Sequence, residues 1–206
     1  VDAAGIRPGS KEGRRILFVG RNFVRKGGPL VVQAFTILRK KYLWSAELYL
    51  AGAKESDIRD ALRERQIRVE EVDWQKIHLL GDLGSEKLTD YYNLCDVFCM
   101  PSYFEAYGLV FAEALTYGLP CIGRDKFAMS EFIEDGCTGR LISGEDAEEL
   151  ALDLWEVLQD PKYREEVERR REWYLREYSW DKVAQRICSV MEKNERDKDQ
   201  YRSAGV

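Results

Sequence analysis

The sequence predicts an α/β fold, in which a parallel sheet is flanked by helices and further helices follow at the C-terminus. Short apolar runs alternate with segments of helical period over most of the chain, a pattern typical of parallel sheets covered on both faces. Glycine and proline residues separate these runs. Of the 206 residues, 45% are apolar, which is enough for one folded core.

The first two strands are predicted from short apolar runs. Residues 16–19 form such a run, and its length is that of a buried strand. A helix is expected to open at Gly28, because Pro29 suits the first helical turn and apolar residues recur at helical spacing over 30–38. The run 48–51 predicts the second strand, and a polar helix is expected to follow it, at about 56–66.

The next two strands are predicted at 77–80 and 97–100. Between them, Ser85 is expected to cap a helix whose apolar residues lie on one face. Pro101 ends the fourth strand, and a helix of about 108–117 follows it. The segment Gly118-Leu119-Pro120 then breaks that helix.

Two shorter apolar runs, 121–122 and 140–142, predict the last two strands. Between them, 130–139 predicts a short helix that ends in a glycine turn. The remainder is expected to be helical, with one or two charged helices over 161–194 and Ser179 placed to cap the second. The predicted units are a linker, a domain, a C-terminal helix and a polar tail, at 1–12, 13–178, 179–194 and 195–206.

Composition excludes several classes of protein. The formal net charge of −5 leaves no basic surplus to neutralise phosphates, so a nucleic-acid partner is not expected. The five cysteines have no C-x-x-C spacing, which predicts mostly buried thiols in a reducing, cytoplasmic setting. No apolar run approaches the ~20 residues of a membrane-spanning helix.

A basic, glycine-rich turn follows the first predicted strand. Gly20, Arg21, Lys26 and Gly27 lie within it; the glycines allow close backbone approach, while arginine and lysine can hold phosphate. The turn has neither the G-K-[ST] ending of a Walker loop nor the G-x-G-x-x-G of a dinucleotide fold. The segment alone fits a phosphate site and a solvated basic turn equally well.

Two carboxylates, Glu105 and Glu113, are separated by eight positions, with Gly108 between them, just after the fourth strand. A strand that ends in a loop and leads into a helix N-terminus is a natural anion site. Carboxylates on either side of it suggest the hydroxyl groups of a sugar or a ribose. The alternatives are that Glu113 pairs with an arginine and that Glu105 is a solvated loop acid.

Together these segments resemble the C-terminal, nucleotide-sugar-binding domain of a GT-B glycosyltransferase of family 4, the retaining family also called glycosyl transferases group 1. Three motifs carry the resemblance, in the right order and over roughly 15–190. They are G-R-x(4)-K-G at 20–27, P-S-x-x-E-x-x-G-x(4)-E-A at 101–114 and E-x-x-x-D-G-x-x-G at 131–139. The chain departs from the family where many relatives have Gly-Gly before the later glutamate, because Arg124-Asp125 and then Phe127-Ala128-Met129-Ser130 are found there.

The resemblance implies a Rossmann-like domain that forms the C-terminal half of a GT-B fold. It implies that Arg21 and Lys26 bind the diphosphate of the sugar donor, that Glu105 contacts the transferred sugar and that Glu113 holds the ribose. The catalytic residues are then Glu105, Arg21 and Lys26, and the donor-binding residues are Gly20, Gly81, Ala106, Tyr107, Gly108, Leu109 and Glu113.

No metal or other cofactor is expected. The Asp-x-Asp triplet at 197–199 lies in the polar tail, and carboxylate metal sites need a shaped cavity. The expected partners are a UDP-, GDP- or ADP-linked sugar and an N-terminal acceptor domain outside this chain. The isolated chain is expected to bind the donor weakly and to transfer nothing, and any membrane contact is expected only through that domain or the acceptor.

Two other functions stay open. The domain could be a binding or regulatory module that kept the fold and lost catalysis. It could also be an unrelated Rossmann-like redox domain, although the lack of G-x-G-x-x-G after the first strand disfavours this.

Overall fold

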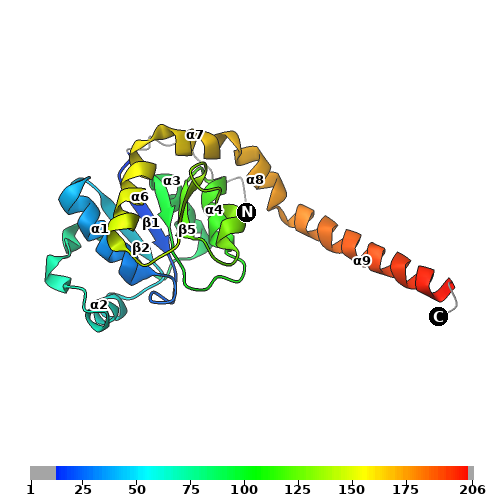
Figure 1. Ribbon diagram of the computed structural model, residues 1–206, viewed down its shortest axis with the longest axis horizontal. Coiled ribbons are helices and arrows are strands. Elements are labelled where there is room, and N and C mark those ends of the chain that lie inside the picture. The colour runs from blue at the N-terminus through cyan, green and yellow to red at the C-terminus, as the bar shows by residue number, and fades with distance from the viewer. Residues whose placement is uncertain (1–12, 204–206) are drawn as a thin grey trace.

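One sheet of six parallel strands forms the centre of the computed structural model, which describes residues 13–203. The predicted linker at 1–12 lies outside the described residues. Figure 1 shows helices on both sides of the sheet. The strands are β1 (Arg15–Val19), β2 (Glu47–Ala51), β3 (Ile77–Gly81), β4 (Val97–Cys99), β5 (Cys121–Arg124) and β6 (Gly139–Ile142). The predicted α/β class and all six predicted strands are confirmed.

The order of the strands across the sheet is β3-β2-β1-β4-β5-β6. Ile16 in β1 is paired with Leu48 in β2 on one side and with Val97 in β4 on the other. β1 and β4 are therefore the two central strands, with β2 and β3 on one side of them and β5 and β6 on the other. In such sheets the crevice at the carboxyl ends of the two central strands is where ligands bind, so the loops after β1 and β4 are the first place to look for a site.

The helices fill the connections between the strands. They are α1 (Gly28–Lys41), α2 (Glu55–Glu64), α3 (Ser85–Leu94), α4 (Leu109–Thr116), α5 (Met129–Phe132), α6 (Ala147–Gln159), α7 (Pro161–Arg169), α8 (Arg171–Glu177) and α9 (Trp180–Ser203), with 3₁₀ turns η2 (Val69–Glu71) and η3 (Trp74–Lys76). Helix α1 packs along α6, as Figure 1 shows, and α4 packs against α8.

Serine caps were predicted for two helices, and the structure has only one of them. The cap of α3 is Gly84, and Ser85 is the first helical residue with no capping hydrogen bond, so the prediction of a Ser85 cap is wrong. Ser179 does cap the last helix, since its Oγ accepts a hydrogen bond from the backbone N of Lys182 at 3.2 Å.

The C-terminal helices are more divided and longer than predicted. The charged segment after 161 forms three helices, because the chain breaks at Arg170 as well as near Ser179. Helix α9 continues to Ser203, through most of the predicted polar tail, and extends away from the rest of the molecule (Figure 1). None of the helices in the described part of the chain is both long enough and apolar enough to cross a membrane.

Burial of the cysteines is only partly as expected. Cys95, Cys99 and Cys121 are buried, whereas Cys137 is half-buried and Cys188 is exposed on α9. Cys188 lies next to apolar residues in sequence, but α9 has no covering element in the described chain near that position, so the local apolar pattern does not lead to burial.

Candidate functional site

The loops after β1 and β4 are joined by hydrogen bonds at the centre of the sheet edge. The backbone N of Tyr103 donates to the carbonyl oxygen of Arg25 at 2.9 Å, and Arg25 Nη1 donates to the carbonyl oxygen of Phe104 at 2.7 Å. The hydroxyl of Ser102, which is buried, lies within hydrogen-bond distance of both carbonyl oxygens. Loops that are 77 or more positions apart in sequence thereby form one unit.

Glycine is required where these loops meet. Gly27 has φ 82°, and a Cβ there would lie 2.4 Å from the carbonyl oxygen of Pro101. At Gly20, a Cβ would lie 2.8 Å from Cγ of Lys26. The lysine side chain therefore runs directly across Gly20, and the geometry of the turn depends on the absence of a side chain at both glycines.

Lys26 and Glu105 are brought together inside this unit. Their side chains form an ion pair, and only 14% of the lysine side chain and 13% of the glutamate side chain are exposed. Charges so shielded from water interact more strongly than an exposed pair, and each depends on the other for compensation. The structure thus joins two of the three predicted catalytic residues in one shielded position.

Arg21, the third of them, lies at the rim. Its Nε is 3.0 Å from Oδ1 of Asp82 in the loop after β3, and the two side chains are 80% and 66% exposed. A backbone hydrogen bond joins the ends of β2 and β3 here, since the N of Gly52 donates to the carbonyl oxygen of Gly81 at 2.7 Å. Gly81 has φ 63°, so the backbone turns sharply there and directs Asp82 toward Arg21.

Glu113 lies in α4 with a partner that the sequence did not suggest. The hydroxyl of Tyr92, in α3, donates a hydrogen bond to Oε2 of Glu113 at 2.9 Å, where an arginine was the alternative considered. Burial raises the pKa of Glu113, and the hydrogen bond from Tyr92 opposes that rise. A cavity of about 310 Å³ opens beside this pair, lined by Ser85, Glu86, Leu88, Thr89, Tyr92, Glu113 and Tyr117.

The start of α4 separates the two carboxylates. Gly108 is its cap, with φ 78° and no side-chain hydrogen bond to the first turn. The first N–H groups of a helix have no partner within the helix and favour an anion. The preceding residues Ala106 and Tyr107 are exposed, as is the side chain of Leu109. The start of α4 therefore has exposed residues on both sides of the buried Gly108.

Arg124 is a residue whose role the sequence did not reveal. Only 4% of it is exposed, and its Nη1 donates to the carbonyl oxygen of Gly144 at 2.7 Å. Its Nη2 lies 3.4 Å from the carbonyl oxygen of Pro101, and its guanidinium lies over the ring of Tyr103 at 4.7 Å. It supports the loop of Glu105 from behind; an arginine at the end of an apolar strand was the only signal in the sequence.

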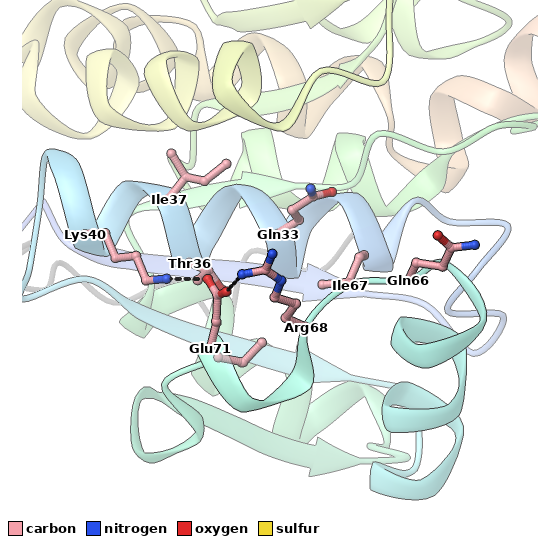
Figure 2. A pocket seen from close by; sticks show the side chains of 9 residues that line it. Gln33, Thr36, Ile37, Lys40, Gln66, Ile67, Arg68 and Glu71 are labelled. Atoms are coloured by element: carbon pink, nitrogen blue, oxygen red, sulfur yellow. Dashed lines mark hydrogen bonds and ion pairs between the residues drawn. The ribbon is translucent and has the colours of Figure 1, made fainter.

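A second hollow lies elsewhere on the molecule, between α1 and η2 (Figure 2). Its volume is about 290 Å³, and Glu71 lies in it between Lys40 and Arg68, with 2.7 Å to each nitrogen. These charges satisfy one another at the surface, and none of the predicted site residues lines the hollow. Among the side chains that the structure describes, no group of three or more histidine, cysteine or acidic residues is placed to hold a metal; those at 197–199 lie outside them.

Comparison with known sequences identifies the family. The profile of the family described as glycosyl transferases group 1 matches residues 7–173. The chain belongs to this family. Membership confirms the resemblance seen in the three motifs and removes the alternative of an unrelated redox domain.

Relatives of this group 1 chain include two curated bacterial enzymes. It is 29% identical over 189 residues to D-inositol 3-phosphate glycosyltransferase of Paenarthrobacter aurescens, covering 87% of this chain and 43% of that protein. It is 28% identical over 184 residues to phosphatidyl-myo-inositol mannosyltransferase of Mycolicibacterium smegmatis, covering 88% of this chain and 46% of that protein. The chain spans less than half the length of these relatives.

Solved structures agree on the fold. The pneumococcal O-GlcNAc transferase GtfA, crystallised in complex with UDP and GlcNAc, superimposes with a TM-score of 0.71 at 23% identity, over 88% of this chain and 36% of that one. The six-stranded parallel sheet and its helices are those of the C-terminal domain of a GT-B glycosyltransferase. Helices α7 to α9 form the last part of the chain.

Proposed function

We propose that this chain is the donor-binding domain of a retaining glycosyltransferase and that it binds a nucleoside diphosphate sugar at the carboxyl ends of β1 and β4. The observation that carries the proposal is the shielded ion pair of Lys26 and Glu105. A cation for phosphate and a carboxylate for hydroxyl groups lie together beside the start of α4, at the position in the sheet where ligands bind.

Each predicted residue then has a task in donor binding. Lys26 exchanges its partner Glu105 for the diphosphate, and Glu105 turns to the hydroxyls of the transferred sugar. The first N–H groups of α4 and the backbone around Gly108 and Leu109 hold phosphate oxygens, while Arg21 closes over them from the rim. Glu113, held by Tyr92 through one carboxylate oxygen, uses the other for the ribose, and the loop of Gly81 lies against the base.

Transfer moves charge onto the nucleotide. The bond between the anomeric carbon and the diphosphate oxygen breaks, and its electron pair stays on the phosphate. The acceptor hydroxyl forms the new bond from the same face and gives its proton to that phosphate oxygen. Lys26, Arg21 and the α4 N-terminus stabilise the developing negative charge, so we propose that no metal is needed. The acceptor is bound by an N-terminal domain outside this chain.

The first test is calorimetric titration of the chain with UDP, GDP and ADP, with and without magnesium. We expect one of the three to bind with equal affinity in both conditions and the Lys26→Ala variant to lose that binding. In the full-length enzyme the same variant should lower transfer by orders of magnitude. Failure of the wild-type chain to bind any of the three nucleotides, or unchanged binding by Lys26→Ala, would contradict the proposal.

Two further properties follow from the same proposal. The chain on its own should transfer no sugar, because the acceptor side of the site is not part of it. The protein should act in the cytoplasm, the reducing setting that its cysteines without C-x-x-C spacing predict. Fractionation of the native protein and a transfer assay with the isolated chain test these points.

A further inference from the structure

Two phenylalanines stand exposed at the edge of the sheet that carries the proposed site. Phe104 precedes Glu105 in the loop after β4, and Phe127 lies in the loop after β5. Their ring centroids are 5.0 Å apart with an interplanar angle of 69°. Phe104 is 50% exposed and Phe127 is 52% exposed. A fixed pair of large apolar rings is therefore presented to solvent.

The backbone of Phe127 is unfavourable for its residue type. Its φ is 57°, in the left-handed region that glycine adopts freely and that strains a bulky side chain. Burial does not compensate, since half of the ring is in water. The stability of the fold therefore gives no reason for phenylalanine at this position, and strain of this kind is concentrated at ligand sites.

Hydrogen bonds hold the backbone at both phenylalanines close to Glu105. The backbone N of Ala128, directly after Phe127, lies 3.5 Å from the carbonyl oxygen of Glu105. The hydroxyl of Ser130 donates to the carbonyl oxygen of Phe127 at 3.2 Å. On the other side, Arg25 holds the carbonyl oxygen of Phe104. The two rings are thus attached through short, hydrogen-bonded backbone segments to the carboxylate proposed to contact the sugar.

We propose that Phe104 and Phe127 contact the pyranose ring of the donor and help to determine which sugar the domain accepts. A pyranose has hydroxyl groups at its rim and C–H groups on its faces. The C–H groups suit the electron-rich face of an aromatic ring, while the hydroxyls turn toward Glu105. The inference rests on the proposed function and extends it, because it assigns sugar recognition to two side chains in the loops after β4 and β5.

The test compares each nucleotide with its sugar conjugate. Titration with UDP and UDP-glucose, GDP and GDP-mannose, and ADP and ADP-glucose gives the gain in affinity that the sugar provides. We expect at least one conjugate to bind about fivefold more tightly than its nucleotide, and this gain to be lost in Phe127→Gly and in Phe104→Ala. Binding of the nucleotide alone should change by less than about twofold.

Stability measurements separate ligand contact from packing. Phe127→Gly relieves the left-handed strain, so its midpoint of thermal unfolding should not fall below that of the wild type, while Phe127→Tyr should keep the sugar gain. The matched control is Trp44→Ala, which removes an aromatic ring that is 77% exposed in another loop and should change neither affinity.

The titrations distinguish failure of this inference from failure of the proposed function. If the wild-type chain binds none of the six compounds, the proposed function is wrong and this inference is wrong with it. If a nucleotide binds but its conjugate shows no gain, or if Phe127→Gly and Phe104→Ala retain the gain, only the inference is overturned. A loss of the same factor for nucleotide and conjugate would also overturn it.

Discussion

Replacement of Lys26 by methionine isolates the ion pair at the centre of the site. Methionine keeps most of the length of the lysine side chain but removes its charge, so Glu105 is left with a carboxylate that is 13% exposed and has lost its cation. Breaking a buried pair on one side costs about 3–5 kcal/mol. Because water reaches the edge of this pair, we expect a loss near the lower end, about 3 kcal/mol.

Urea unfolding followed by tryptophan fluorescence measures this loss. With a denaturant slope of about 2 kcal/mol per molar urea, a change of about 3 kcal/mol lowers the midpoint by about 1.5 M. The matched control is Lys40→Met, which removes an exposed lysine from its 2.7 Å pair with Glu71. That variant should shift the midpoint far less, because an exposed pair is screened by water and salt.

The double variant Lys26→Met with Glu105→Gln separates stability from binding. It removes both charges, so it should recover most of the stability that Lys26→Met loses. It should not recover nucleotide binding, because the phosphate still lacks its lysine. A midpoint for Lys26→Met no lower than that for Lys40→Met would refute the structural reasoning, and a double variant as unstable as the single one would show that the loss does not arise from the unpaired carboxylate.

Three further predictions concern the surroundings of this pair. Burial raises the pKa of Glu113, so the folded state holds its proton more tightly than the unfolded state; the stabilisation is present below the unfolded pKa of 4.5 and is lost as the pH rises through the folded value. The free energy of unfolding of the wild type should therefore fall relative to that of Glu113→Gln as the pH rises above about 4.5. The fall should be steeper in Tyr92→Phe, which lacks the hydrogen bond that opposes the raised pKa of Glu113, and parallel curves for wild type and Glu113→Gln would contradict this. Gly27→Ala should lose about 2 kcal/mol or more in urea unfolding, since φ is positive and a backbone carbonyl blocks the Cβ, whereas Gly84→Ala, with φ −72° and open space around it, should change little; equal losses would show that the close approach is unimportant. Arg124→Gln should cost about 1–3 kcal/mol, because it removes the donors to the carbonyl oxygens of Gly144 and the buried Pro101. It should also weaken nucleotide binding, and calorimetry showing normal affinity would mean that this arginine does not position the loop of Glu105.

The fold was predictable because its signals are local. A strand such as 16–19 is a short apolar run bounded by polar or glycine residues, and the helix after it repeats its apolar positions with helical period. Boundaries were less certain: the cap of α3 moved from Ser85 to Gly84, and an extra break appeared at Arg170. Alternatives at a helix end differ by a small free energy, which packing can reverse.

The candidate site was predictable in its residues and not in its connections. Motif spacing by itself indicates that Lys26, Glu105 and Glu113 lie at the carboxyl edge of the sheet, because each follows a predicted strand. It gives no indication that Tyr92, on the apolar face of another helix, is the partner of Glu113. A side chain with several possible partners interacts with the one that the fold brings nearest. The spacing of apolar residues along the sequence does not give distances between separate elements of the fold.

The sequence by itself thus determined the class of the fold, the order of its elements and the motifs that mark its family, because each depends on neighbouring residues or on their spacing. Only the tertiary structure decided that Lys26 and Glu105, 79 positions apart, meet in a shielded pair, that Arg21 remains at the rim, and that Phe127 takes a conformation suited to glycine. These properties depend on how loops from different strands approach one another, and that approach is set by the packing of the whole sheet and its helices.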